Sequence, residues 1–258
     1  DVTSLMATDL LPLLLKVPPD GNQAAAAVAL LRRWDGSMAL DRPEPLIFSA
    51  WLRQLTRLVF ADELGDLFPG AWQERPIFLA NVLADKNGES RWCDDVAAKK
   101  AQSCDALVAR ALNLALAGLA GDCGSDISRW RWGEAHYARM AHRPFSRLTV
   151  LGWLFDITVP TPGDAYTIDA GNFAIANPAE PFASGFAPSL RAIYDLADLD
   201  RSLFIQSTGQ SGNRLSPHYA DFSERWARVA YLPMSTRADD IAEGALGTLT
   251  LLPAKATP

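Results

Sequence analysis

Apolar residues recur at the spacing of an α-helix from about Ala7 to about Ala141. The clearest example is the segment PLIFSAWLRQLTRLVFADELGDLF. The residues that this pattern places on one face of a helix are Ile47, Trp51, Leu55, Leu58 and Val59. We therefore predict that this half of the chain is helical.

Glycine residues mark the ends of further helices. An Ala-rich helix, AAAAVALLRRW, is expected to follow Asp20 and to end near Gly36, because a glycine can close a helix in the left-handed conformation. The segment CDALVARALNLALAGLAG predicts another amphipathic helix, which begins at Cys104 and ends at Gly121. The Ala and Leu residues of this helix require another element to pack against.

The pattern changes after about Asp156, where short apolar segments are bounded by Gly, Pro and Asp residues. The segments that read as strands are DAYTIDAGNFAIANP, FAPSLRAIYDL, RSLFIQST, WARVAYLP and GTLTLLP. Helices followed by strands predict an α+β fold with a mainly antiparallel sheet. We expect a helical region over residues 1–145 and a strand-rich region over residues 146–258.

Alternation along PSLRAIYDL singles out one carboxylate. Side chains of a strand point alternately to opposite faces, so Asp195 is expected on the same face as Arg191 and Ile193. A carboxylate in that position requires a partner.

Composition excludes several classes of protein. The chain has 258 residues, of which 49% are hydrophobic, and this is typical of a packed globular protein. A formal net charge of −6, with scattered Lys and Arg residues, argues against binding of nucleic acid. The early apolar run from Leu10 to Val17 is too short to cross a bilayer, so we expect a buried helix and no membrane partner.

The chain begins at Asp1 without a signal peptide, which indicates a processing site or an artificial boundary.

Neither a metal nor another cofactor is expected. The chain contains three Cys and three His residues, without CxxC or HExxH spacing, and it lacks GxGxxG and P-loop patterns. Cys93 and Cys104 lie about eleven residues apart. Either they close a short disulfide loop in an oxidising compartment, or they stay reduced with Cys123 in a helical layer.

The polar segment QSTGQSGNRLSPHY contains candidates for a hydrolytic triad. Ser216, His218 and Asp221 have the right side chains, but they fall within one turn region, whereas triad residues converge from different elements. No GxSxG motif is present. We therefore interpret the segment as a turn in which His218 and Tyr219 hold the loop.

The segment WRWGEAHYARMAHRPF, from Trp130 to Phe145, concentrates aromatic residues and two histidines. It is either an aromatic shelf for a ligand or a Trp-rich helix in which His136 and His142 are hydrogen-bonded spacers. The composition favours the second interpretation.

Seven segments, taken in order, carry a resemblance to a known family. They are DVTSLMATDLLPLLL at the start, WDG at Trp34, WCDD at Trp92, WRWGEAHYARMAHRPF at Trp130, GDAYTIDAGNF at Gly163, GFAPSLRAIYDLADLDRSLF at Gly185, and GQSGNRLSPHYADF followed by Trp226. Together they resemble the C-terminal part of the β chain of the penicillin acylase family, which includes cephalosporin and acyl-homoserine lactone acylases. The ordered matches over nearly the whole chain are more specific than any single one.

The resemblance implies an N-terminal nucleophile hydrolase with an αββα sandwich. In that family a precursor cuts itself and exposes a Ser, Thr or Cys whose own α-amino group is the base for amide hydrolysis. Asp1 cannot supply this nucleophile. We therefore expect a fragment whose partners are an upstream α chain and the N-terminal part of the β chain, and whose substrate is a small linear amide such as a penicillin, cephalosporin or acyl-homoserine lactone side chain.

The resemblance also implies roles for particular residues. In cephalosporin-acylase-like members an acidic residue of the strand resembling LRAIYDL orients a His near the nucleophile, which gives Asp195 a catalytic role here. An ion pair of Asp195 with Arg191 or another neighbour is an equally good interpretation. Family members are exported to the periplasm or beyond, which favours a Cys93–Cys104 disulfide and leaves Cys123 unpaired.

Two rival functions stay open beside the acylase interpretation. In the first, the chain by itself is an inert structural or interaction module. In the second, the chain comes from a family member that has lost its nucleophile and only binds ligands.

Overall fold

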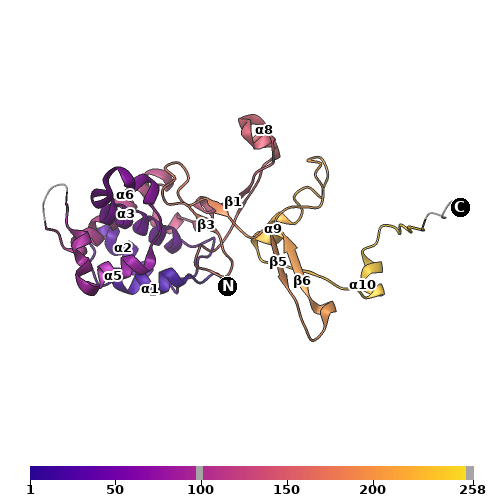
Figure 1. The fold of residues 1–258 in the computed structure, drawn as a ribbon, viewed down its shortest axis with the longest axis horizontal. Helices are drawn as coiled ribbons and strands as arrows, with labels where there is room; N and C mark the ends of the chain where they lie inside the picture. The colour runs from indigo at the N-terminus through magenta and orange to yellow at the C-terminus, as the bar shows by residue number, and fades with distance from the viewer. Residues whose placement is uncertain (97–100, 254–258) are drawn as a thin grey trace. The chain divides into compact units, whose positions relative to one another are not determined.

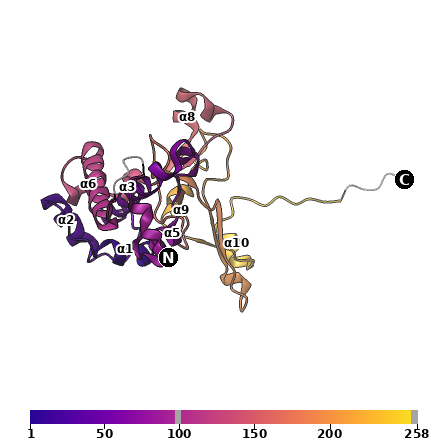
Figure 2. The same cartoon turned by 60° about the vertical axis from the view of Figure 1, so that its left-hand side comes forward.

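The computed structural model describes residues 1–96 and 101–253. The chain forms two compact units, Asp1–Pro188 and Ser189–Pro258. The first unit contains the long helices, which lie together in Figures 1 and 2, and a small sheet. The described residues of the second unit contain a separate sheet and two short α-helices.

The first unit has eight α-helices among its described residues. Their bounds are α1 Leu5–Leu14, α2 Asn22–Leu31, α3 Glu44–Leu64, α4 Phe68–Ala71, α5 Pro76–Leu83, α6 Cys104–Cys123, α7 Trp132–Ala135 and α8 Thr149–Phe155. Short 3-10 helices are η1 Gly65–Leu67, η2 Lys86–Cys93, η3 Ile127–Arg129 and η4 Phe145–Arg147, with η5 Leu199–Arg201 in the second unit.

The side chain of Ser4 caps α1 by accepting from the N–H of Ala7, and that of Ser103 caps α6 by accepting from Ala106. The Ala-rich helix, the long central helix and the helix that begins at Cys104 are confirmed as α2, α3 and α6. The predicted end of the Ala-rich helix near Gly36 is wrong, because α2 ends at Leu31 and its C-cap is Arg32 in the right-handed conformation.

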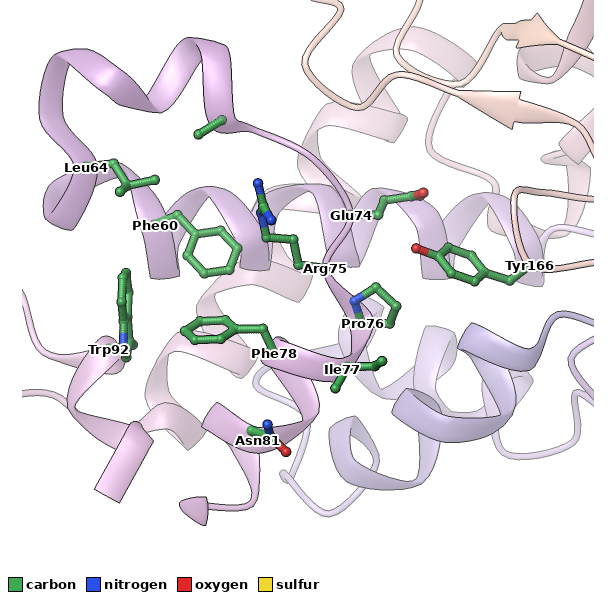
Figure 3. A pocket seen from close by; sticks show the side chains of 11 residues that line it. Phe60, Leu64, Glu74, Arg75, Pro76, Ile77, Phe78, Asn81, Trp92 and Tyr166 are labelled. Carbon is green, nitrogen blue, oxygen red and sulfur yellow. The ribbon is translucent and has the colours of Figure 1, made fainter. Parts of the chain in front are cut away.

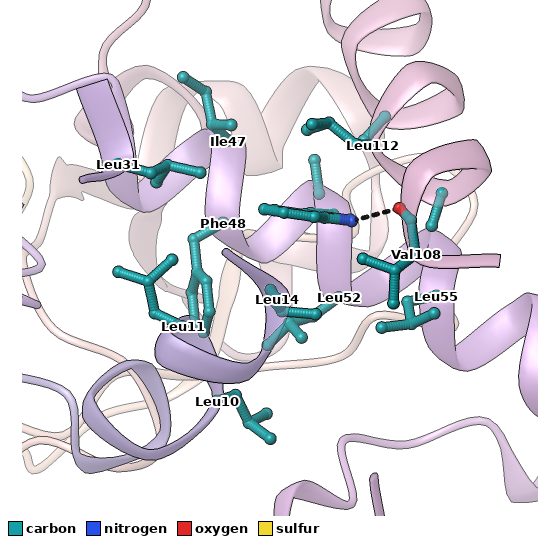
Figure 4. Close-up of a cluster of buried hydrophobic side chains, with 14 of the residues drawn as sticks. Leu10, Leu11, Leu14, Leu31, Ile47, Phe48, Leu52, Leu55, Val108 and Leu112 are labelled. Atoms are coloured by element: carbon teal, nitrogen blue, oxygen red, sulfur yellow. Dashed lines mark hydrogen bonds between the residues drawn. The ribbon is translucent and has the colours of Figure 1, made fainter. Parts of the chain in front are cut away.

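The core of the first unit is built on the packing of α3 against α6. Leu10 and Leu14 of α1 and Leu31 of α2 complete it, and each is at most 1% exposed (Figure 4). Trp51 of α3 is 1% exposed, and its indole N–H donates to the carbonyl of Val108 in α6 at 2.9 Å, the dashed line in Figure 4. The apolar face of the helix that follows Cys104 therefore finds its partner in the central helix.

One helix among the described residues, α6, is long and apolar enough to span a membrane by length and composition alone. Its apolar positions Leu107, Ala111 and Leu116 are buried in the helical core. This is the setting of a core helix in a globular domain.

The first unit also carries a four-stranded sheet of order β2-β1-β4-β3. Its strands are β1 Tyr137–Met140, β2 Ile157–Pro160, β3 Asn172–Phe173 and β4 Ser184–Phe186. β1 pairs antiparallel with β2, from Tyr137 opposite Pro160 to Met140 opposite Ile157, while β1 and β4 are parallel. β1 lies inside the region predicted to be helical, so that prediction is wrong after Ala135. Only a pairing partner that is distant in sequence makes this segment a strand.

The second unit has an antiparallel sheet of order β5-β6-β7. Its elements are β5 Leu190–Ile193, β6 Leu203–Gln206, α9 Ser223–Ala227, β7 Leu232–Pro233 and α10 Ala238–Glu243. Arg191 joins sheet and helix, because its guanidinium donates to the Trp226 carbonyl at 2.6 Å and lies 4.3 Å from the centre of the indole ring. Trp226 is fully buried.

Helices followed by mainly antiparallel strands confirm the predicted α+β class, but three predicted strands are wrong in detail. DAYTIDAGNFAIANP contains only Asn172–Phe173 as strand, and WARVAYLP begins inside α9 and ends with Leu232–Pro233. GTLTLLP, residues 247–253, forms no strand. A strand forms only where another strand satisfies its backbone groups, which an alternating pattern alone does not guarantee. The predicted boundary between a helical region, residues 1–145, and a strand-rich region, residues 146–258, stays a prediction.

Candidate functional site

Asp195 lies just after β5, in the turn that leads to β6. Its Oδ1 accepts from the backbone N–H of Ala197 at 3.0 Å and of Asp198 at 3.4 Å, while its Oδ2 lies 3.5 Å from Nε of Arg201. Its own N–H donates to Oγ of Ser202 at 3.1 Å. The side chain is 30% exposed. The carboxylate therefore holds the β5–β6 turn and keeps one side open to solvent.

Of the ion-pair partners expected for Asp195, Arg191 or another neighbour, the structure shows Arg201, whereas Arg191 contacts Trp226. All three histidines of the chain contact other groups: His136 pairs with the Phe182 carbonyl, His142 stacks on a phenylalanine, and His218 pairs with Asp221. That the imidazole oriented by Asp195 comes from outside these 258 residues stays a prediction.

The segment QSTGQSGNRLSPHY is a loop tied to itself by its backbone. The N–H of Gly209 donates to the Tyr219 carbonyl at 3.0 Å, and a side chain at Gly209 would collide with the carbonyl oxygen of His218. Nδ1 of His218 lies 2.9 Å from Oδ2 of Asp221, but Oγ of Ser216 accepts from the backbone N–H of His218 and does not contact the ring. The three side chains therefore do not form a hydrolytic triad, and the loop is architectural.

The Trp-rich segment forms a closed aromatic cluster and not the predicted helix, since α7 ends at Ala135 and β1 follows. Trp132 is fully buried and stacks on His136 with ring centres 4.5 Å apart. Nδ1 of His136 lies 2.7 Å from the Phe182 carbonyl and must carry the proton, because a carbonyl only accepts. Burial lowers the pKa of His136 to about 4, so the imidazole is neutral near pH 7. Such a buried cluster offers no shelf to a ligand.

The segment GDAYTIDAGNF contributes a buried polar turn that sequence reasoning missed. Oδ2 of Asp164 accepts from Oγ of Ser4 at 2.6 Å, and its Oδ1 accepts from the N–H of Tyr166 at 2.7 Å. The N–H of Asp164 donates to Oγ1 of Thr167 at 3.0 Å. Burial raises the pKa of Asp164 above its ordinary value. The turn fixes the start of α1, and its polar residues gave no sign of burial in the sequence.

A pocket of about 730 Å³ opens in the first unit (Figure 3). Its apolar walls are Phe60, Leu64, Pro76, Ile77, Phe78 and Trp92. Glu74 and Tyr166 line its polar end, where Glu74 is half-buried and burial raises its pKa to about 8, with a smaller contribution from the Asp164 carboxylate. The residues come from separate segments, and nothing in the sequence indicates that they line one pocket.

The sulfur atoms of Cys93 and Cys104 lie 2.00 Å apart in a disulfide that joins the end of η2 to the start of α6. Cys123, at the other end of α6, is a free and exposed cysteine. Within residues 1–96 and 101–253, no group of three or more His, Cys, Asp or Glu side chains is arranged to hold a metal ion.

Comparisons with known proteins give consistent matches along the chain. A model of the family described as penicillin amidase matches residues 1–243. Acyl-homoserine lactone acylase QuiP of Pseudomonas syringae pv. syringae (strain B728a) is 28% identical over 247 residues, which are 92% of this chain and 29% of that protein. Penicillin acylase 2 proenzyme of Pseudomonas sp. (strain SE83) is 29% identical over 231 residues, which are 86% of this chain and 28% of that protein.

The fold matches a solved structure as well. Thermostable penicillin G acylase from Alcaligenes faecalis aligns with all of this chain and 48% of its own, with a TM-score of 0.52 and 18% sequence identity. The chain thus spans less than a third of the two curated relatives named above.

Proposed function

Because the chain belongs to the penicillin amidase family, we propose that it forms part of an amide hydrolase that releases an acyl group through a covalent acyl-enzyme. The observation that carries the proposal is the family match over residues 1–243. Both relatives described above are named as acylases, one for acyl-homoserine lactones and one for penicillin. A penicillin, cephalosporin or acyl-homoserine lactone side chain is therefore the proposed class of substrate.

We propose that the nucleophile lies outside residues 1–258, in another part of the same enzyme. The chain spans 29% of the acyl-homoserine lactone acylase, which leaves room for an upstream α chain and the first part of a β chain as partners. Ser216, the candidate nucleophile within the described residues, does not contact a base, because its Oγ accepts from the backbone N–H of His218. We also propose a periplasmic or secreted enzyme, and the Cys93–Cys104 disulfide supports an oxidising compartment.

Within that enzyme, we propose that Asp195 is a positioning residue. Its carboxylate is half-buried, already fixed by the N–H groups of the turn, and open on one side. It would hold one tautomer of an imidazole that is supplied by another part of the enzyme and would stabilise the charged form of the ring. The Arg201 contact, at 3.5 Å and on a side chain that is 73% exposed, leaves it free to do so.

The test is hydrolysis of a chromogenic acyl amide by the longer polypeptide that contains residues 1–258. It should turn over the amide, and the 258-residue chain alone should not. Asp195→Asn should lower kcat/KM by about 10- to 100-fold, as loss of a group that orients a functional residue commonly does. Because a carboxylate raises the pKa of a histidine beside it, the acidic limb of the pH profile should also move to lower pH.

Asp198→Asn is the matched control. Asp198 lies in the same turn, where its Oδ2 contacts Arg237 at 3.1 Å, so its loss perturbs the turn without touching the proposed imidazole. The positioning role fails if Asp198→Asn reproduces the loss, or if Asp195→Asn leaves the pH profile in place. Turnover by the 258-residue chain alone would contradict the external nucleophile, and binding of the amide without turnover by the longer polypeptide would contradict the hydrolase.

A further inference from the structure

One end of the 730 Å³ pocket is built from three aromatic rings. Phe60 of α3, Phe78 of α5 and Trp92 of η2 contact one another pairwise, with ring centres 5.1 to 6.0 Å apart. The indole of Trp92 is nearly perpendicular to both phenyl rings, at 78° and 88°. The three rings form the left-hand end of the pocket in Figure 3, and Pro76 and Ile77 continue the apolar wall.

The opposite end of the pocket presents a carboxyl group. In Figure 3 the carboxyl group of Glu74 and the hydroxyl group of Tyr166 lie near each other at this end. Glu74 forms no hydrogen bond or ion pair with any residue that the structure describes, and the charge that acts most strongly on it is the like charge of Asp164. A carboxyl group at a pocket wall without a cationic partner is costly to ionise, and a bound cation would remove that cost.

Arg75 is the one cationic side chain among the lining residues of this pocket. It is exposed, and in Figure 3 its guanidinium points toward the Leu64 side, away from Glu74 and Tyr166. Two residues adjacent in sequence therefore place an acidic and a basic group at different places on the rim. This arrangement allows the two groups to be tested separately.

We propose that this pocket binds a small organic ammonium ion with an aryl or alkyl body. The body would lie against the aromatic end, and the ammonium group would pair with Glu74. A cation also gains from the electron-rich faces of Phe, Tyr and Trp rings, which line this pocket on both ends. The volume falls within the range of about 300–1,000 Å³ that is usual for small-ligand sites, and mostly apolar walls with few polar groups are typical of them.

The inference goes beyond amide hydrolysis and does not depend on it. The pocket is lined only by residues of the first unit, whereas Asp195 belongs to the second. Failure of one proposal therefore leaves the other standing.

The probe that tests the site is benzyltrimethylammonium, which has an aromatic body and a permanent charge. Calorimetric titration of the 258-residue chain should show saturable binding, and Glu74→Gln should weaken it by roughly tenfold, as expected for loss of one charged partner. Arg75→Gln, the matched control, should leave the affinity unchanged or raise it. Benzyl alcohol, the neutral probe, should bind more weakly and equally to the wild-type chain and to Glu74→Gln.

The pH dependence of binding gives a second measurement. The pKa of Glu74 is raised to about 8, so the free carboxyl group is mainly neutral below that pH, and affinity for the permanently charged probe should rise with pH through this value. Glu74→Gln should abolish the rise. The other titratable groups facing Glu74 are Tyr166, whose pKa is raised by burial, and Asp164, whose carboxylate accepts hydrogen bonds from Ser4 and from the N–H of Tyr166.

Three outcomes would overturn the proposal. They are equal affinity of Glu74→Gln and wild type for the probe, no binding of the probe by a chain whose circular dichroism shows it to be folded, and preferential binding of phenylacetate that Arg75→Gln removes. The last result would assign the pocket to a carboxylate ligand or to an acidic segment of a partner chain.

Discussion

Replacement of Gly163 by alanine is expected to lower the free energy of unfolding of the chain by about 3–5 kcal/mol. Gly163 has φ +88°, a conformation that residues with a Cβ rarely adopt. A Cβ there would also collide with the carbonyl oxygen of Asp169 and lie 2.7 Å from Oγ1 of Thr167. Both contacts belong to the buried turn that holds Asp164 beside Ser4, so the backbone cannot shift without breaking those hydrogen bonds.

The control for this substitution is Gly118→Ala. Gly118 lies inside α6 on an exposed turn of the helix, and a Cβ there would meet nothing within 4 Å. Because alanine is the better helix former, this variant should gain about 0.5–1 kcal/mol. Urea denaturation followed by far-ultraviolet circular dichroism measures both. Equal stability of the two variants would show that the 163–171 turn is not rigid.

The same turn illustrates what the sequence does not encode locally. DAYTIDAGNF alternates well enough to read as a strand, yet the hydroxyl of Thr167 bonds to the backbone of Asp164 and the carboxylate of Asp164 accepts from the N–H of Tyr166 inside the turn. Whether a polar side chain is buried depends on a donor far away in sequence, here Ser4, which lies 160 residues upstream. Pattern reasoning has no access to that pairing.

Helices were predictable where their signals are local. The periodicity that includes Trp51 and Leu55 fits one turn of helix after another, and α3 forms over Glu44–Leu64. Strands were less predictable, because GTLTLLP has the residues of a strand but pairs with none in the described part of the chain. Alternation placed Asp195 near a charged partner, but the partner is Arg201, which the β5–β6 turn brings back to it.

The pocket shows a further limit of sequence reasoning. Phe60, Phe78 and Trp92 are each ordinary apolar positions of separate segments, and their rings meet only after α3, α5 and η2 pack together. The unusual pKa of Glu74 follows from the same packing, since burial is its main cause. A carboxylate in the segment QERP gives no signal of its own in the sequence.

Truncation of Trp51 to alanine is expected to lower the free energy of unfolding by about 3–5 kcal/mol, the usual cost of removing a large buried aromatic side chain. Trp51 is 1% exposed and fills the contact between α3 and α6, where its indole N–H donates to the Val108 carbonyl at 2.9 Å. Trp51→Phe keeps most of the apolar volume and should cost about 1–2 kcal/mol, chiefly for the lost hydrogen bond and a small cavity.

Trp153 of α8 provides the matched control for this prediction, because the same side chain is 84% exposed there. Trp153→Ala should change the free energy of unfolding by no more than about 0.5 kcal/mol. Denaturation must be followed by circular dichroism, since each variant removes a fluorophore. If Trp51→Ala is no less stable than Trp153→Ala, the α3–α6 contact does not hold the first unit together. A larger stability difference between Trp51→Ala and Trp51→Phe than between Trp51→Phe and wild type would show that packing volume contributes more there than the single hydrogen bond.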